Sequence, residues 1–244
     1  MATVALIGVD GAGKTTLSRK LLASFPLPWK YIYMGRNIES SNYALLSSRF
    51  IHWLKVRKYR KQHKLDDTKL HRPVTLHDLN EDRKEDTRGK LGATFRMFNR
   101  MAEEWYRQII ALYFQARGYV ILYDRHFLFD ALPDNLDSSL QKSRWSNRFH
   151  RWVLYKYYPK PDLVIYLEAP PELLYRRKKE ASLEYLSARS EAFLQLARNF
   201  PNVIIVDAAQ SAEKVYQDVA EKLYEFFQKR APRKLTGEFV NIET

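Results

Sequence analysis

The sequence predicts an α/β fold in which a five-stranded parallel sheet is flanked by helices within one domain. Two observations support this prediction. Apolar and β-branched residues form short runs without polar alternation, as in strands buried on both faces. Segments of helical periodicity separate these runs, as expected when helices cover both faces of a parallel sheet. The expected strands are Thr3–Gly8, Trp29–Met34, Tyr119–Asp124, Asp162–Leu167 and Asn202–Val206.

The clearest helical pattern precedes the third expected strand. Its apolar residues recur at steps of three and four, which places them on one face of a helix. They are Phe98, Met101, Trp105, Ile109, Leu112 and Ala116. The pattern ends at Gly118, and glycine commonly terminates helices. A shorter apolar-periodic stretch, from Leu17 to Leu22, follows the first strand.

The composition is that of an ordinary globular protein. The chain has 244 residues, of which 45% are hydrophobic and 28% are charged, which argues against wholesale disorder. A chain of this length buries roughly 70–75% of its unfolded surface. It contains no cysteine, which excludes disulfides, thiolate metal sites and cysteine nucleophiles. The sequence contains no run of about 18 apolar residues, so no membrane-spanning helix is expected.

We expect residues 1–230 to form a single domain, with residues 38–92 inserted after the second strand and residues 231–244 as a fraying tail. Residues 65–92 are polar and of mixed charge, which is typical of a loop or a partly ordered insertion. Residues 131–140 have the composition of a second loop. The first strand begins almost at the first residue, so no signal peptide is expected, and the cytoplasm is the expected location.

A phosphate-binding loop is predicted between the first strand and the first helix, where the sequence matches G-x-x-x-x-G-K-[ST]. Glycines let consecutive backbone N–H groups turn toward an anion, and the helix that follows adds its positive end. Lys14 can reach the β- and γ-phosphates, and the Thr15 hydroxyl can bind Mg²⁺. A turn that binds nothing would leave a buried Lys14 without a partner. The expected nucleotide-binding residues are Gly8, Asp10, Gly11, Ala12, Gly13, Lys14, Thr15 and Thr16.

A carboxylate and a guanidinium, Asp124 and Arg125, end the third expected strand. Ligands of open parallel sheets bind beyond the carboxyl ends of the strands. Asp124 would therefore lie near Mg²⁺ and bind it directly or through water. Arg125 could hold a phosphate through two parallel hydrogen bonds. A surface ion pair at the end of a strand is the alternative, and the nearby phosphate loop favours the functional interpretation.

Together these motifs resemble the thymidylate kinase family among the P-loop nucleoside and nucleotide kinases. GVDGAGKTT resembles the phosphate loop of that family, and Asp124-Arg125-His126 is similar to its Asp-Arg-aromatic element. PDLVIYLEAPPELLYRRKKE, from Pro161, resembles its fourth strand and arginine-bearing lid. VIIVDAAQSAEKV, from Val203, is similar to the last strand and the loop that borders adenine. The resemblance covers roughly residues 1–35 and 98–230.

The resemblance implies a P-loop NTPase fold that transfers the γ-phosphoryl group of ATP, with Mg²⁺, to a nucleoside monophosphate. Such catalysis consists mainly of positioning and charge neutralisation. Lys14 would act on the β- and γ-phosphates, Asp10 would face the acceptor or its metal shell, and Arg125 would hold the acceptor phosphate. A homodimer through a helix of the 98–117 type would also fit the family.

The lid is expected at residues 176–184. Either Arg176 or Arg177 would close over the phosphates, exclude water and stabilise the transferring group. The alternative for these arginines is a solvated basic helix end that complements the helix dipole.

The acceptor side departs from the family pattern. Ile7 stands where the family usually has Glu, and of the family's Arg-Glu-Pro element only Arg36, offset by position, has a counterpart. Phe127–Asp130 replaces the serine-rich stretch that helps to hold thymine. The small phosphate acceptor is therefore either a nucleoside monophosphate or another molecule, such as a nucleoside or a phosphosugar. The pattern resembles divergent thymidylate kinase-like proteins, some of which accompany bacterial surface-polysaccharide genes.

The net charge of +13 resides in two segments. Residues 49–64 contain seven Lys and Arg, residues 141–160 contain six, and neither segment contains an acid. Segment 49–64 can form a helix with Phe50, Trp53 and Leu54 on one face. This helix could pack on the core, dock on an anionic membrane surface or bind nucleic acid. In segment 141–160, aromatic residues at helical spacing suggest core packing.

Two functions from different classes follow. The first is a phosphotransferase, and the second is a nucleotide-dependent module that docks on a membrane or nucleic acid through residues 49–64. Arginines in the lid favour the first, because a binding module needs no arginine over the phosphates. The histidines in residues 52–77 have no regular ligand spacing, so Mg²⁺ is the only metal expected.

Overall fold

The structure, a computed structural model, describes residues 1–35, 37, 41–62, 90–131, 145–179, 181–198 and 200–230. The predictions for Arg36, for most of the 65–92 loop, for residues 132–140 and for the tail after residue 230 lie outside the described residues.

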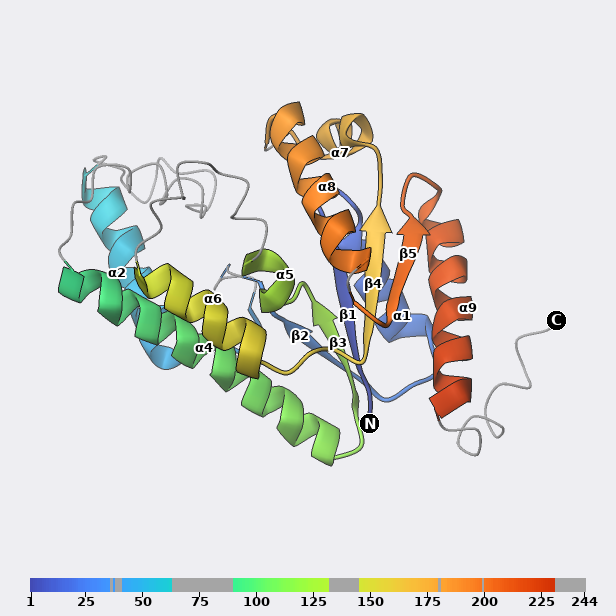
Figure 1. The fold of residues 1–244 in the computed structure, drawn as a ribbon, viewed down its shortest axis with the longest axis horizontal. Helices are drawn as coiled ribbons and strands as arrows, with labels where there is room; N and C mark the ends of the chain where they lie inside the picture. The colour runs from blue at the N-terminus through green and yellow to red at the C-terminus, as the bar shows by residue number, and fades with distance from the viewer. Residues whose placement is uncertain are drawn as a thin grey trace.

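Five parallel strands form one sheet, as the sequence predicts (Figure 1). They are β1 (Thr3–Gly8), β2 (Trp29–Tyr33), β3 (Val120–Asp124), β4 (Leu163–Glu168) and β5 (Val203–Asp207). The order across the sheet is β2-β3-β1-β4-β5. The three inner strands are buried almost throughout, which explains why their sequences are continuously apolar.

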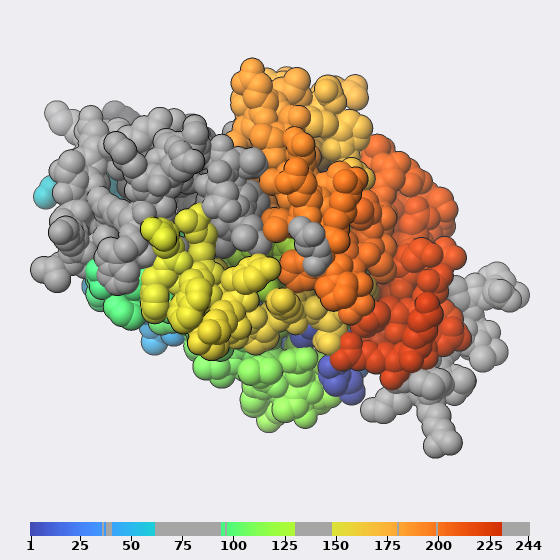
Figure 2. All heavy atoms as spheres, viewed as in Figure 1, coloured from blue at the N-terminus to red at the C-terminus, as the bar shows by residue number. Residues whose placement is uncertain are grey.

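Helices cover both faces of the sheet. α1 (Lys14–Ser24) and α9 (Ala212–Arg230) pack together on one face, while α4 (Lys90–Ala116) and α8 (Leu183–Arg198) lie against the other. α6 (Trp145–Tyr157) packs on α4, next to the short α5 (Phe127–Ala131). α7 (Pro171–Arg177) contacts α8, and α2 (Leu46–Gln62) contacts α4. Figure 2 shows α6 in yellow and α8 in orange on the surface of the molecule. Within the described residues, no helix is long and apolar enough to cross a membrane.

The structure corrects the boundary between the expected loop and the long helix. α4 begins at Lys90, so residues 90–92 are helical and not part of the 65–92 loop. The sequence shows the reason, because Leu91, Phe95 and Phe98 continue the apolar periodicity toward the N-terminus at steps of four and three.

The structure argues against core packing for the apolar side of segment 49–64, and it confirms the core packing expected of segment 141–160 only in part. On α2 the apolar side chains of the predicted face point away from the core: Leu46 is 82% exposed, Phe50 58% and Trp53 50%. The side of α2 that contacts α4 carries the small polar Ser48, which is buried. α6 is divided, since Val153 and Leu154 are buried but Trp152 and Tyr157 are about half exposed.

Candidate active site

The phosphate loop lies at the carboxyl end of β1, at the centre of the sheet. Its glycines Gly8, Gly11 and Gly13 all have positive φ, and Gly13 is the N-cap of α1. A Cβ atom on Gly11 would lie 2.9 Å from the carbonyl oxygen of Leu174. Glycine at this position therefore lets the loop pack directly against α7, the helix that carries Arg176 and Arg177.

Lys14 is held inside the loop. Its side chain is almost fully buried, and Nζ donates to the carbonyl oxygens of Gly8 and Val9, at 2.9 Å each. Nζ also lies 4.0 Å from Oδ1 of Asp10. The hydroxyl-bearing residues Thr15 and Thr16 are exposed at the start of α1. The loop thus holds the ammonium group of Lys14 against its own backbone carbonyls.

Asp124 reaches the same edge of the sheet from β3. It pairs with Leu6 of β1 and with Tyr33 of β2, and it is 3% exposed. Its Oδ2 accepts a hydrogen bond of 2.9 Å from the hydroxyl of Tyr31. Burial, and next the negative charge of Asp124, raise the pKa of Tyr31. The phenol therefore remains a donor to the carboxylate at neutral pH.

Arg125 joins the two motifs. It has a φ of 67°, which is uncommon for a residue with a side chain, and its guanidinium pairs with Asp10 in the phosphate loop. Burial acts to raise the pKa of Asp10, but Arg125, Lys14 and Lys178 outweigh it and lower that pKa below its usual value. Asp10 is therefore a carboxylate surrounded by three cations.

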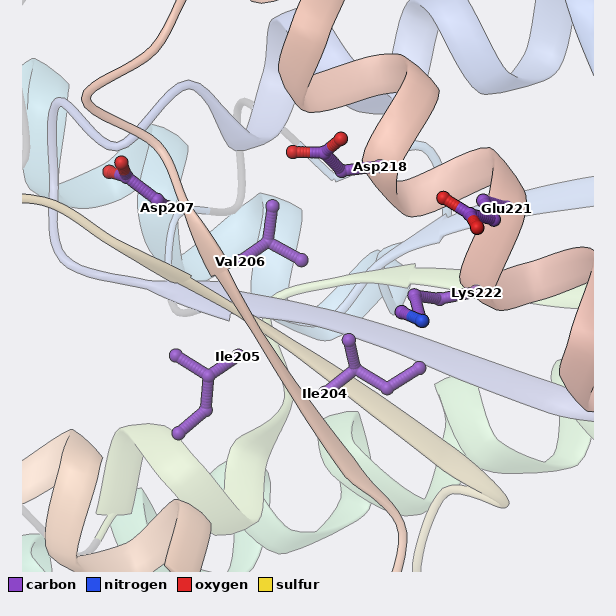
Figure 3. A pocket seen from close by; sticks show the side chains of 7 residues that line it. All are labelled: Ile204, Ile205, Val206, Asp207, Asp218, Glu221 and Lys222. Carbon is purple, nitrogen blue, oxygen red and sulfur yellow. The ribbon is translucent and has the colours of Figure 1, made fainter.

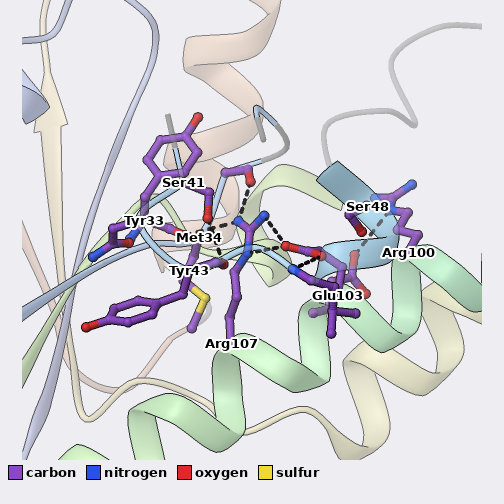
Figure 4. A network of polar contacts seen from close by, with 12 residues as sticks. Tyr33, Met34, Ser41, Tyr43, Ser48, Arg100, Glu103 and Arg107 are labelled. Atoms are coloured by element: carbon purple, nitrogen blue, oxygen red, sulfur yellow. Dashed lines mark hydrogen bonds and ion pairs between the residues drawn. The ribbon is translucent and has the colours of Figure 1, made fainter. Parts of the chain in front are cut away.

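A buried polar network on α4 holds the chain segments next to Arg125 in place (Figure 4). The guanidinium of Arg107 contacts Glu103 at 2.7 Å and 2.9 Å and donates to the carbonyl oxygens of Tyr33 and Gly35 at 3.1 Å and 2.8 Å. Glu103 also accepts a 3.0 Å hydrogen bond from the N–H of Leu45. α4 thereby fixes the chain that leaves β2 as well as the chain that enters α2.

Gly35 brings this segment against Arg125. A Cβ atom at Gly35 would overlap the hydroxyl of Tyr33 and would lie 2.7 Å from Cδ of Arg125. The chain after β2 therefore forms one wall beside the guanidinium. Arg36, the adjacent predicted substrate residue, lies outside the described residues, so its position relative to the wall stays a prediction.

A cleft of about 330 Å³ opens on the other side of the phosphate loop. The loop and the first turns of α1 line one wall, and Arg177, Ala208, Gln210 and the start of α9 line the other. Nη1 of Arg177 donates a 2.8 Å hydrogen bond to the carbonyl oxygen of Ala208. Arg176 is exposed at the end of α7. Of the two predicted lid arginines, Arg177 is thus the one that borders this cleft.

A second cavity, of about 210 Å³, lies between β5 and α9 (Figure 3). It is lined by Ile204, Ile205 and Val206 and by three acids, Asp207, Asp218 and Glu221, with Lys222. An excess of carboxylates disfavours a polyphosphate, and no residue of the phosphate loop reaches this cavity. We therefore place the candidate site at the loop.

His126 follows Arg125 but does not enter the site. It is 1% exposed and packs against the rings of Tyr123, Phe129 and Tyr158. Among the described residues, neither of its ring nitrogens has a hydrogen-bond partner. Burial lowers the pKa of His126 to about 3. The side chain is therefore neutral at physiological pH and belongs to the aromatic packing between β3, α5 and α6.

Comparison with known proteins supports the resemblance in sequence. The chain is 32% identical over 79 residues to a thymidylate kinase of Photobacterium profundum, and 27% identical over 117 residues to a probable thymidylate kinase of Staphylothermus marinus. It is 26% identical over 125 residues to a probable thymidylate kinase of Sulfolobus acidocaldarius. The chain is similar to thymidylate kinases. These alignments cover 29–47% of the chain and only 38–60% of the relatives.

Solved structures support the predicted α/β fold with its five-stranded parallel sheet. A deoxyadenosine kinase from M. mycoides, with the products dCMP and dCDP bound, covers 91% of this chain with a TM-score of 0.52 and 17% identity. The same enzyme with bound dATP covers 92% of the chain, again with a TM-score of 0.52. At this identity the likeness establishes the fold alone. No protein-family model matches the chain.

The structure places most of the predicted site residues around one point. The phosphate loop, Lys14, Asp124 and Arg125 meet at the carboxyl ends of β1 and β3. Sequence reasoning missed Tyr31, Gly35 and Arg107. The sequence offered no signal for Tyr31 and Arg107, because their partners lie 93 and up to 74 residues away along the chain. The glycine directly after the second strand was a usable signal, since such a residue often marks a close backbone approach.

Proposed function

We propose that this protein is an ATP- and Mg²⁺-dependent phosphotransferase of the cytoplasm, thymidylate kinase-like, that acts on a nucleoside monophosphate. One observation carries the proposal: the ion pair between Asp10 and Arg125 joins a phosphate loop to a guanidinium at the end of the neighbouring strand. One site thus combines the groups needed for a phosphoryl donor with a cation suited to an acceptor phosphate. The partial thymidylate kinase alignments support the same proposal.

The donor fits the cleft beside Arg177. Its base would occupy the space between α1 and the Ala208–Gln210 segment, and its phosphates would run along the N–H groups of the loop into the N-terminus of α1. Lys14 would exchange its two backbone carbonyl partners for phosphate oxygens. Because those carbonyls belong to Gly8 and Val9 of the loop, the exchange needs only a small movement of Nζ.

The residues present fit Mg²⁺. The Thr15 hydroxyl and the Asp124 carboxylate are hard oxygen donors, and Mg²⁺ in such sites takes one or two protein oxygens together with phosphates and water. A cluster of three acids or histidines, which is absent among the described residues, is therefore not required. When bound, the ion would neutralise charge on the phosphates. Tyr31 would hold the Asp124 carboxylate in position.

The acceptor phosphate would be held by Arg125, next to Asp10 and against the wall formed by Gly35 and Tyr33. Asp10 keeps the guanidinium pointed at the loop, so an arriving phosphate finds it already oriented. Arg177, fixed on Ala208, would cover the donor, and Arg176 at the exposed end of α7 is the arginine free to move with the lid at residues 176–184. Each arginine neutralises charge that develops during transfer.

The direct test is ADP formation by the purified protein with ATP and Mg²⁺, over a panel of all nucleoside monophosphates, nucleosides and phosphosugars. We expect turnover with at least one nucleoside monophosphate. Lys14→Ala should lower the rate by at least 100-fold, while Lys214→Ala, on the exposed side of α9, should not. Circular dichroism checks that both variants are folded. Turnover with only a nucleoside or a phosphosugar would support the proposed kinase activity but contradict a nucleoside monophosphate as the acceptor. If no acceptor leads to ADP formation, the proposal as a whole is contradicted.

We also propose that the protein forms a homodimer through α4. Phe95, Phe98, Ile109 and Tyr113 are 50–64% exposed. Their spacing places them on one stripe opposite the buried Glu104 and Ala111. Light scattering after size exclusion should give twice the chain mass. Ile109→Asp should give a monomer, and a wild-type monomer at micromolar concentration would contradict the dimer.

A further inference from the structure

The outward face of α2 has a chemistry that the phosphotransferase site does not use. Leu46, Phe50, Trp53 and Leu54 are 44–82% exposed, and their spacing of four, three and one residues keeps them within one side of the helix. Arg57 and Lys61 extend the same side toward the end of the helix and are exposed. We call these six residues the α2 face. α2 contains no acidic residue.

The α2 face is preformed because the helix is attached to α4 at its beginning. The N–H of Leu45 donates to Glu103 at 3.0 Å. The hydroxyls of Ser47 and Ser48 each lie 3.1 Å from the side-chain amide of Asn99. An interfacial helix that is already folded does not need to order its backbone when it binds.

We propose that the α2 face docks the protein on an anionic membrane surface. Helices that lie in the plane of the lipid interface insert Trp, Phe and Leu side chains, while neighbouring Lys and Arg side chains extend their charges to the headgroups. Here the apolar side chains would enter the boundary between headgroups and acyl chains. The cations on and beside the stripe, Arg49, Arg57, Lys58 and Lys61, all exposed, would meet the anionic headgroups.

The ring geometry favours lipid over nucleic acid. Single strands bind by stacking bases on free aromatic faces. Trp53 already has Phe50 stacked on it at 5.8 Å, from the preceding turn, and the Arg57 guanidinium over it at 5.3 Å, from the following turn. Leu46 and Leu54 offer no stacking surface. The arrangement therefore suits insertion of an apolar edge better than intercalation of bases.

Charge favours lipid over a second copy of this chain. Six Lys and Arg lie on α2 with no acid among them. An interface between two α2 faces would bring the four cations of the two Arg57 and Lys61 pairs together with no acid on either helix to compensate them, and like charges at an interface are strongly unfavourable. An anionic surface removes that repulsion.

Docking would act on a helix that is connected to the wall beside Arg125 through buried contacts. Leu45 contacts Glu103, Glu103 holds Arg107, and Arg107 holds the carbonyls of Tyr33 and Gly35 beside Arg125. The membrane-binding helix and the wall of the acceptor site thus share one buried support. This proposal does not depend on the phosphotransferase activity, because binding to vesicles is measured without substrate.

The test is co-sedimentation of the full-length chain with vesicles of phosphatidylcholine alone and of phosphatidylcholine with 30% phosphatidylglycerol, at low and high salt. We expect binding only to the anionic vesicles, and weaker binding at high salt. Phe50→Ala with Trp53→Ala should lower the partition coefficient at least 10-fold. Arg57→Gln with Lys61→Gln should lower it roughly 30-fold, because each cation near the surface contributes a factor of about five.

Matched controls keep the test specific. Leu183→Ala with Tyr185→Ala removes two side chains of similar exposure from α8, and Lys214→Gln with Lys222→Gln removes two charges from α9. Both should bind within about twofold of the wild type. The absence of binding to anionic vesicles at low salt would overturn the proposal, as would an equal loss in the control variants. Binding of a labelled single-stranded oligonucleotide, with no vesicle binding, would overturn it in favour of nucleic acid.

Discussion

Arg125, in a left-handed backbone conformation at the end of β3, pairs with Asp10 in the phosphate loop, 115 residues earlier in the chain. The φ of 67° turns the side chain back toward β1, whose Leu6 carbonyl accepts the N–H of Arg125 at 3.0 Å. A residue other than glycine in this conformation costs about 1–2 kcal/mol. The fold retains this strain where the guanidinium meets the loop, as is common at functional sites.

Replacement of Arg125 should therefore separate function from stability. Arg125→Ala and Arg125→Gly should both raise the acceptor KM at least 10-fold, because a charge-assisted hydrogen bond contributes about 1.5–3 kcal/mol, while ATP affinity changes less than threefold. Arg125→Gly should be more stable than Arg125→Ala by about 1 kcal/mol in urea unfolding. The exposed Arg117→Ala serves as the control. An equal loss of acceptor and ATP binding would argue against the clamp.

Gly35 should be needed for the shape of the acceptor wall. In Gly35→Ala, the new methyl group would displace Tyr33 and the Arg125 side chain, both of which can move without unfolding the protein. We expect a higher acceptor KM with a melting temperature within a few degrees of the wild type. The double variant Gly35→Ala with Tyr33→Ala removes the ring that the new methyl group would overlap, so its acceptor KM should return part of the way to that of the wild type. If the double variant is no better than Gly35→Ala, the overlap with Tyr33 is not the cause.

The central fold could be predicted because each inner strand carries its own evidence. A strand buried on both faces must be continuously apolar, so β1, β3 and β4 stand out without knowledge of their neighbours. The phosphate loop is equally local. The role of Arg107 could not be predicted in this way, since an Arg four residues after a Glu is also typical of an ion pair on the exposed face of a helix. Only the path of the chain after β2 places two carbonyls over that guanidinium.

The exposure of the α2 face also could not be predicted, because periodicity shows that a helix has an apolar face but not whether that face points to the core or to solvent.

The Glu103–Arg107 pair should be far more important for stability than a surface pair. Arg107 is 1% exposed and Glu103 7%, and loss of one partner leaves a buried charge, which costs about 3–5 kcal/mol. Glu103→Leu should therefore destabilise the protein by this amount in urea unfolding. Glu103→Leu with Arg107→Met should recover part of the loss. Glu225→Leu, which breaks an exposed pair with Lys222, should cost less than about 1 kcal/mol. Similar losses for Glu103→Leu and Glu225→Leu would refute the buried support.

His126 should make stability depend on pH in the acidic range. Burial lowers its pKa to about 3 in the folded protein, whereas an unfolded chain titrates near 6.5. Between these values the unfolded state binds the proton and the folded state does not, so stability falls as the pH falls from about 6.5 toward 3. His126→Phe fits the aromatic surroundings and should flatten this part of the curve. The pKa of Asp10 is lowered in the folded protein, so its contribution to stability is lost only as the pH falls through the usual pKa of a carboxyl, near 4.

Urea unfolding at steps of half a pH unit would measure this effect. Phosphotransfer at pH 7.5 should be retained in His126→Phe, because the neutral ring lies in the packing between β3, α5 and α6 and does not touch the loop. A slope that persists in His126→Phe would assign the acid sensitivity to another group. A loss of activity without a loss of stability would instead make His126 part of the site.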